Sequence, residues 1–87
     1  MVERDDGRIL VTGALGQIGT DLVQSLREIY GSEMVIASDI REKPGHPCII
    51  NGQYTNLDVL DKDRISKIIR DFNIKIIYHL AAILSAR

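Results

Sequence analysis

The sequence predicts an α/β fold in which strands alternate with helices along one parallel sheet. Apolar runs of strand length occur at 9–11, 34–38 and 74–79. Between these runs, two longer segments carry apolar residues at helical spacing. Alternation of this kind is typical of strands joined by right-handed crossovers. With a short additional strand at 53–55, it predicts a parallel sheet in the spatial order 3-2-1-4.

The first strand leads into a glycine turn. Ile9, Leu10 and Val11 form the continuous apolar run expected of a strand that is covered on both faces. Glycines then follow at every third position, as Gly13, Gly16 and Gly19. The first glycine permits a tight turn, the second lets backbone approach a pyrophosphate, and the third lets a helix pack closely on the sheet. N–H groups at the start of that helix would face the phosphates.

The helix after the turn is predicted over 17–30, and Gly31 is placed to end it. A second apolar strand, 34–38, ends at Asp39, about 20 residues after the last glycine of the turn. The helix is recognised by apolar residues that recur on one face, namely Ile18, Leu22, Val23, Leu26 and Ile29.

An acidic residue at the end of the second strand indicates a dinucleotide site. The Asp39 carboxylate can accept hydrogen bonds from both hydroxyls of the adenosine ribose, and it would repel a 2′-phosphate. The combination of strand, glycine turn, helix, strand and acid therefore predicts NAD rather than NADP. Arg41 is a counter-indication, because a nearby arginine can accommodate a 2′-phosphate.

Residues 40–52 are predicted to form a loop, since they contain both prolines of the chain and the turn pair Asn51-Gly52. His46 and Cys48 lie two positions apart within it. No second pair at a zinc-like spacing accompanies them, so no metal site is predicted.

The third strand, 53–55, is followed by Asp58 and Val59, which would lie at its carboxyl end. There the carboxylate can accept from the exocyclic amine of adenine while the valine covers the ring. Alternatively, Asp58 can be an ordinary turn or cap residue. Asp61 is a good N-cap for a second helix that Asn73 can end, and the apolar face of this helix comprises Ile65, Ile68, Ile69 and Phe72.

The fourth strand, 74–79, is rich in β-branched residues and runs into Leu80, Ala81 and Ala82. These small and apolar residues would let backbone approach the middle of the cofactor. Ser85 can hydrogen-bond a substrate or can simply start a helix, and the residue type alone does not decide between the two.

Length and composition bound the remaining possibilities. The 87 residues carry a formal net charge of −1, with charges of both signs scattered along the chain. This argues against a nucleic-acid-binding stripe or an anionic-membrane partner. No apolar run reaches the roughly 18 residues of a membrane span, and the polar start of the sequence favours the cytoplasm. Residues 1–7 are expected to be a flexible N-terminus, and residues 8–87 the N-terminal part of a dinucleotide-binding domain.

The segment Thr12 to Gly19 matches the T-G-x-x-G-x-x-G pattern of the extended short-chain dehydrogenases/reductases, the NAD-dependent epimerase/dehydratase group. Segments 58–59 and 79–82 resemble the adenine-side and fourth-strand motifs of that group. Within it, residues 16–20, 35–41 and 81–86 look most like the short-chain type of L-threonine 3-dehydrogenase. The resemblance implies a Rossmann-type fold and NAD as cofactor.

The resemblance also implies particular roles. Ser85 would match a residue at the substrate pocket, where L-threonine would be oxidised at carbon 3 to 2-amino-3-oxobutanoate. The full-length enzyme would act as a homo-oligomer, a dimer. The positions implied for NAD are Gly13, Gly16, Gln17, Ile18, Gly19, Asp39, Ile40, Arg41, Asp58, Val59, Leu80, Ala81 and Ala82.

The sequence departs from the group in one respect. Members use a tyrosine in a Y-x-x-x-K arrangement as the base, whereas Tyr30, Tyr54 and Tyr78 are not followed four residues later by lysine. No catalytic residue is therefore assigned, and the fold is expected to be truncated after the fourth strand. Two alternatives stay open: part of a nucleotide-sugar epimerase or dehydratase, and a non-catalytic fragment that binds a dinucleotide.

Overall fold

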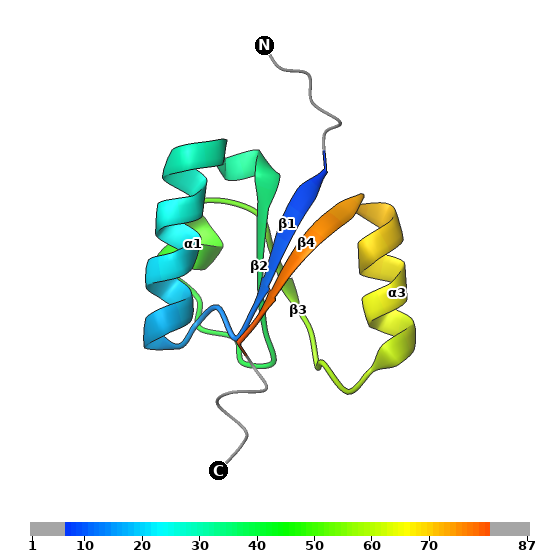
Figure 1. The fold of residues 1–87 in the computed structure, drawn as a ribbon. Helices are drawn as coiled ribbons and strands as arrows, with labels where there is room; N and C mark the ends of the chain where they lie inside the picture. Colours follow the sequence, from blue (N-terminus) through cyan, green and yellow to red (C-terminus); the bar gives the residue numbers. More distant parts are fainter. Residues whose placement is uncertain (1–6, 81–87) are drawn as a thin grey trace.

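Four parallel strands form one sheet in the order β3-β2-β1-β4 in the computed structural model, which describes residues 7–80 (Figure 1). This is the predicted order. Parallel pairing places the carboxyl ends of all four strands at one edge of the sheet. The elements are β1 (Arg8–Thr12), α1 (Gln17–Tyr30), η1 (Ser32–Met34), β2 (Val35–Asp39), α2 (Pro47–Ile50), β3 (Tyr54–Asn56), α3 (Lys62–Asp71) and β4 (Ile74–His79).

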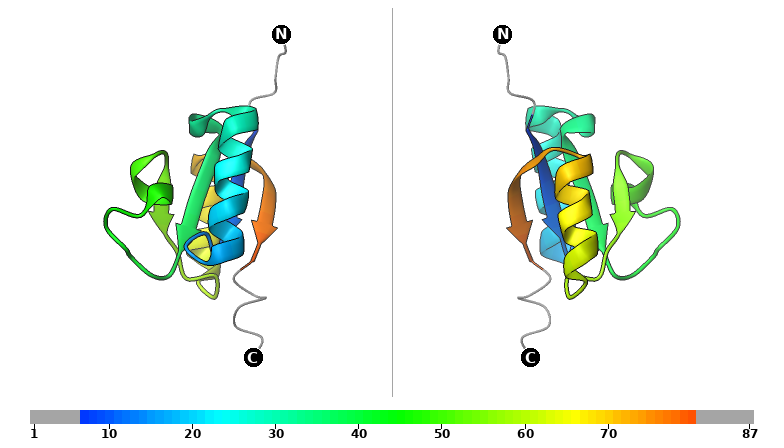
Figure 2. Two further views of the ribbon diagram at one scale, coloured as in Figure 1. Left: turned by 90° about the vertical axis from the view of Figure 1, so that its left-hand side faces the viewer. Right: turned by 90° about the vertical axis from the view of Figure 1, so that its right-hand side faces the viewer.

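Helices cover both faces of the sheet, with α1 and α2 on one face and α3 on the other (Figure 2). Successive strand residues point to opposite faces, so Ile9 and Val11 pack toward α1 while Leu10 packs toward α3. Val35 and Ile36 alternate in the same way. The central strands are therefore buried on both sides, which explains why they read as continuous apolar runs.

The helix ends follow local signals. Gly31 has φ of 100° and its N–H donates to Arg27 O at 2.9 Å, which ends α1. Asn73 adopts φ of 55° directly after the C-cap of α3. At the other end of α3, the Asp61 carboxylate accepts from the Arg64 N–H at 3.1 Å. All three were predicted from residue type.

Three details of the sequence prediction were wrong. Residues 40–52 are not entirely loop, because Pro47–Ile50 form the short helix α2 with His46 as its N-cap. In α1 the predicted apolar stripe is narrower than expected: Ile18 and Ile29 are exposed, whereas Arg27 is buried. The 3₁₀ turn η1 also takes Met34 out of the second strand. No helix in the described part of the chain is long and apolar enough to cross a membrane.

The outer edge of β4 has no partner strand within residues 7–80. Ile76, Ile77 and Tyr78 are exposed there, and an uncovered apolar edge is a template for another chain. We expect the isolated 87-residue chain to associate as its concentration rises, and Ile77→Lys to reduce this association. Sedimentation velocity at several concentrations measures both, and a strictly monomeric wild-type chain would contradict the open-edge argument.

Candidate functional site

The glycine turn lies at the carboxyl edge of the sheet, between β1 and α1. Gly13 adopts φ of 69°, a conformation that L side chains disfavour. The turn is tied to β2 because the Ala14 N–H donates to Ser38 O at 2.9 Å. A Cβ on Gly19 would collide with Gly13 O and lie 2.8 Å from the Cα of Ala14. The third glycine thus lets α1 pack against the turn itself, rather than against the sheet as the pattern suggested.

The start of α1 is suited to an anion. Gly16 is the N-cap and supplies no capping side chain, and the first turn contains no acidic residue. The first N–H groups of a helix have no intrahelical acceptor, and the helix dipole adds positive potential there. Gln17 and Ile18 are exposed at this end. This end of α1 therefore offers backbone N–H groups to an anion, and the binding of a pyrophosphate here stays a prediction.

Asp39 ends β2 beside the glycine turn and is buried. Its Oδ2 accepts from the Leu15 N–H at 3.0 Å and from Nη2 of Arg41 at 2.9 Å. Its Oδ1 accepts from the Arg41 N–H and from Nε of Arg41, each at 3.0 Å. Asp39 thus lies at the end of the second strand, as predicted, and Arg41 forms a two-point ion pair with it. Its binding of a ribose stays a prediction.

This environment sets the ionisation of Asp39. Burial opposes the charged form, but hydrogen bonds from Arg41 and Leu15 and the charge of Arg41 outweigh it. The pKa of the Asp39 carboxyl is therefore lower than its usual value. The group stays an ionised hydrogen-bond acceptor at neutral pH.

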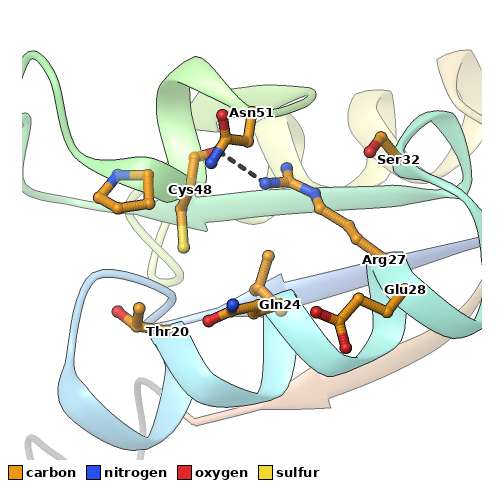
Figure 3. Close-up of a pocket in the computed structure, with 9 residues that line it drawn as sticks. Thr20, Gln24, Arg27, Glu28, Ser32, Cys48 and Asn51 are labelled. Carbon is orange, nitrogen blue, oxygen red and sulfur yellow. Dashed lines mark hydrogen bonds between the residues drawn. The ribbon is translucent and has the colours of Figure 1, made fainter.

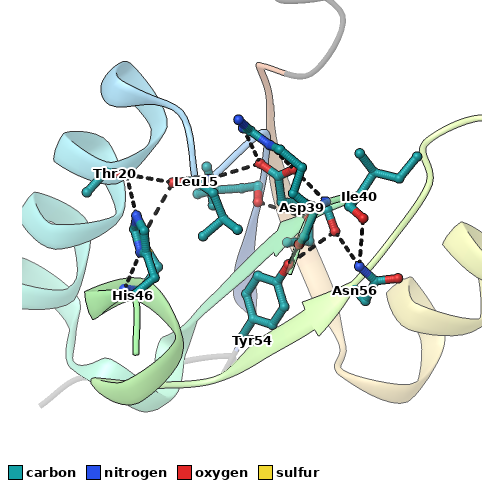
Figure 4. A network of polar contacts seen from close by, with 12 residues as sticks. Leu15, Thr20, Asp39, Ile40, His46, Tyr54 and Asn56 are labelled. Atoms are coloured by element: carbon teal, nitrogen blue, oxygen red, sulfur yellow. Dashed lines mark hydrogen bonds and ion pairs between the residues drawn. The ribbon is translucent and has the colours of Figure 1, made fainter. Parts of the chain in front are cut away.

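Tyr54 and Asn56 of β3 hold the backbone around Asp39 in place (Figure 4). The Tyr54 hydroxyl lies 2.6 Å from Arg41 O and 3.2 Å from Asp39 O. The Asn56 amide donates to Asp39 O at 3.1 Å and to Ile40 O at 3.0 Å. Sequence reasoning missed both residues, because the predicted strand order does not give the register that brings these side chains to the backbone at 39–41.

Of the remaining residues predicted to bind the cofactor or substrate, the structure describes some and not others. The Asp58 carboxylate accepts from the Leu60 N–H at 2.9 Å, which is the turn role, and Val59 is half-buried. Leu80 packs against the core cluster on the α1 side. Ala81, Ala82 and Ser85 lie outside the described residues.

His46 and Cys48 have structural partners. Nδ1 of His46 accepts from the Cys48 N–H at 3.1 Å, and its Nε2 lies 3.4 Å from the Thr20 hydroxyl. Cys48 is buried, its thiol donates to Ala14 O at 3.6 Å, and burial raises its pKa. A thiol of this kind is a poor nucleophile. Within the described residues, no group of three or more His, Cys, Asp or Glu side chains could hold a metal ion.

A hollow of about 480 Å³ lies between α1 and α2 (Figure 3). Its most buried polar side chain is Arg27, whose guanidinium donates to Cys48 O at 2.9 Å, Gln53 O at 2.6 Å and Val35 O at 3.3 Å. A Cβ on Gly52 would lie 2.5 Å from Cζ of Arg27. Arg27 thus joins α1 to the segment between β2 and β3. Its Nη1 and Nη2 donate to backbone carbonyls, whereas its buried Nε has no hydrogen-bond partner among the described residues.

The sequence profile of the NAD dependent epimerase/dehydratase family matches residues 9–87. The chain belongs to this family. Its members are NAD-dependent enzymes. The glycine turn, the buried Asp39 and the strand order of this chain therefore occur in the context of a dinucleotide-dependent family. A cofactor of the NAD(P) type follows from membership.

Relatives within the family extend the comparison. The chain is 51% identical over 79 residues to an uncharacterized epimerase/dehydratase of Staphylococcus aureus strain USA300, covering 91% of the chain and 25% of that protein. It superimposes on L-threonine dehydrogenase from Clostridium difficile with a TM-score of 0.80 and 45% identity, covering 87% of the chain and 24% of that one. On L-threonine 3-dehydrogenase from Trypanosoma brucei it superimposes with a TM-score of 0.75 and 42% sequence identity; the match covers 83% of this chain and 23% of that protein. The chain thus spans about a quarter of the length of these relatives.

Proposed function

We propose that the chain is the NAD-binding portion of an oxidoreductase that acts as an L-threonine 3-dehydrogenase. The observation that carries the proposal is the 45% identity to the Clostridium difficile threonine dehydrogenase across 87% of the chain. The second support is local. Asp39 is an ionised acceptor at the end of β2, where an adenosine ribose would be recognised.

Each element of the edge has a role in this proposal. The glycine turn and the first N–H groups of α1 bind the pyrophosphate. Asp39 binds the adenosine ribose and gives NAD its advantage over NADP, while Asp58 and Val59 border the adenine. Leu80, Ala81 and Ala82 lie beside the nicotinamide-side ribose, and Ser85 contacts the substrate. NAD, when bound, supplies the acceptor for the hydride from carbon 3 of threonine.

Proton abstraction needs a positioned base with a tuned pKa. None of Tyr30, Tyr54 and Tyr78 is followed by a lysine four residues on, and the Tyr54 hydroxyl is within hydrogen-bond distance of backbone carbonyls. Residues outside these 87 would therefore supply the base, the rest of the substrate pocket and the contacts of a homodimer. The chain alone is expected to be inactive.

A spectrophotometric assay tests the proposal. The complete natural polypeptide that carries this chain should reduce NAD when L-threonine is added, and reduce NADP at least tenfold more slowly at equal concentration. The matched control is the same reaction with L-valine, which lacks the side-chain hydroxyl. The proposal would be wrong if threonine produced no NADH while a uridine or thymidine diphosphate sugar was turned over. That result would identify a nucleotide-sugar epimerase or dehydratase instead.

The alternative function is a nucleotide-sugar epimerase or dehydratase. The observation that favours it is that the 51% identical relative from Staphylococcus aureus is described as an epimerase/dehydratase. Such an enzyme would share the turn, Asp39 and the order of the sheet. The substrate would be bound by residues beyond this chain, so the assay with both substrates separates the two.

A further inference from the structure

All the acceptor capacity of the Asp39 carboxylate is occupied within the protein. An ionised carboxylate offers about four lone-pair positions, two on each oxygen. Backbone donors, the N–H groups of Leu15 and Arg41, fill one position on each oxygen. The Arg41 side chain fills the other two, with Nε on Oδ1 and Nη2 on Oδ2. No position is left for an incoming hydroxyl.

The two positions held by the Arg41 side chain match what a ribose needs. A ribose diol presents two O–H donors from neighbouring carbons, and a guanidinium presents two N–H donors side by side. Withdrawal of the side chain would free one position on each carboxylate oxygen. The backbone donors would remain and keep the carboxylate oriented toward the same edge of the sheet.

The side chain can leave without disturbing the backbone. The Arg41 side chain is 43% exposed, whereas that of Asp39 is 4% exposed. The Arg41 main chain is held by its own N–H on Asp39 Oδ1 and by the Tyr54 hydroxyl on its carbonyl. Only side-chain rotation into solvent is required, which is fast compared with cofactor binding.

We propose that the Arg41 guanidinium is an internal competitor for the adenosine ribose and thereby lowers the preference for NAD over NADP that Asp39 provides. This rests on the proposed cofactor site. In the cofactor-free protein Arg41 occupies the positions of the ribose hydroxyls on Asp39. NAD must displace it, so the apparent affinity equals the intrinsic affinity multiplied by the fraction of molecules in which the pair is open. A 2′-phosphate would instead gain the displaced cation as a partner.

The competitor role predicts opposite effects on the two cofactors. Arg41→Met keeps an apolar stem and the backbone N–H but removes both side-chain donors. In the complete natural polypeptide, we expect NAD to bind about three- to tenfold more tightly and NADP about threefold or more weakly than in the wild type. At 0.5 M salt, the ratio of the NAD affinity of Arg41→Met to that of the wild type should fall toward one, because salt weakens the half-exposed ion pair between Asp39 and Arg41 in the wild type.

Isothermal titration of NAD and NADP into the wild type, Arg41→Met and the control Arg70→Met measures these effects. Arg70 is an exposed arginine at the end of α3, so its loss should leave both affinities within about twofold. Unchanged or weaker NAD binding by Arg41→Met, with wild-type NAD binding intact, would overturn the competitor role alone. Absence of NAD binding in all three folded proteins would overturn the proposed cofactor site and this inference with it.

Discussion

Replacing Arg27 by methionine will destabilise the protein by about 3–5 kcal/mol. The variant keeps the aliphatic stem but removes the guanidinium donors to the carbonyls of Val35, Cys48 and Gln53. Of these, Gln53 O keeps the Ala37 N–H as a donor. Charge-assisted hydrogen bonds contribute about 1.5–3 kcal/mol each, and losing buried partners together is costly. Because domains have only about 5–15 kcal/mol of stability, a loss of this size should clearly lower the midpoint of thermal unfolding.

Thermal unfolding of the complete natural polypeptide, followed by circular dichroism, measures the Arg27 effect. The matched control is Arg70→Met on the exposed end of α3, expected within about 0.5 kcal/mol of wild type. Arg27→Lys should fall between the two, because an ammonium is a point charge without the fork of a guanidinium. An Arg27→Met protein as stable as the control would show that water replaces the lost donors.

Asp39→Asn will weaken NAD binding by about 100-fold. The asparagine has almost the same shape but has no charge, so the two hydrogen bonds proposed from the ribose lose their charge-assisted part, about 3 kcal/mol in total. NADP should lose much less, since the variant also removes the repulsion of a 2′-phosphate. Calorimetric titration of both cofactors checks the prediction. A variant that retains full preference for NAD would move the discrimination to other residues.

The same variant gives a test in acid. The folded-state pKa of Asp39 lies below its usual value, so its ionised form stabilises the native protein above the unfolded-state pKa. This contribution is lost as the pH falls through the folded-state pKa, below about pH 4. Wild type should therefore lose more stability than Asp39→Asn between pH 5 and the acid limit, as measured by urea unfolding. Parallel acid profiles would indicate that Arg41 and Leu15 do not stabilise the charge.

Much of the fold was predictable because its signals are local. A run such as Ile9 to Val11 can be buried on both sides only in an inner strand. Gly13, Gly31 and Asn73 adopt positive φ values in turns or at helix ends, where these residue types are favoured. Right-handed crossovers then leave the order 3-2-1-4 as the expected arrangement. These features follow from backbone preferences and patterning within a few residues.

The sequence by itself thus determined the sheet, the glycine turn and the position of Asp39 at the end of β2. Only the tertiary structure decided which partners the polar side chains have. Arg27 is a charged residue of α1, and the residue pattern of the helix did not predict its burial. It becomes buried because the segment between β2 and β3 folds over it. Asp39 and Arg41 are two residues apart, yet their pairing depends on residues distant in sequence: the Leu15 N–H holds the Asp39 carboxylate, and the Tyr54 hydroxyl holds the backbone carbonyl of Arg41. Hydrogen bonds of this kind depend on three-dimensional geometry, which residue spacing does not encode.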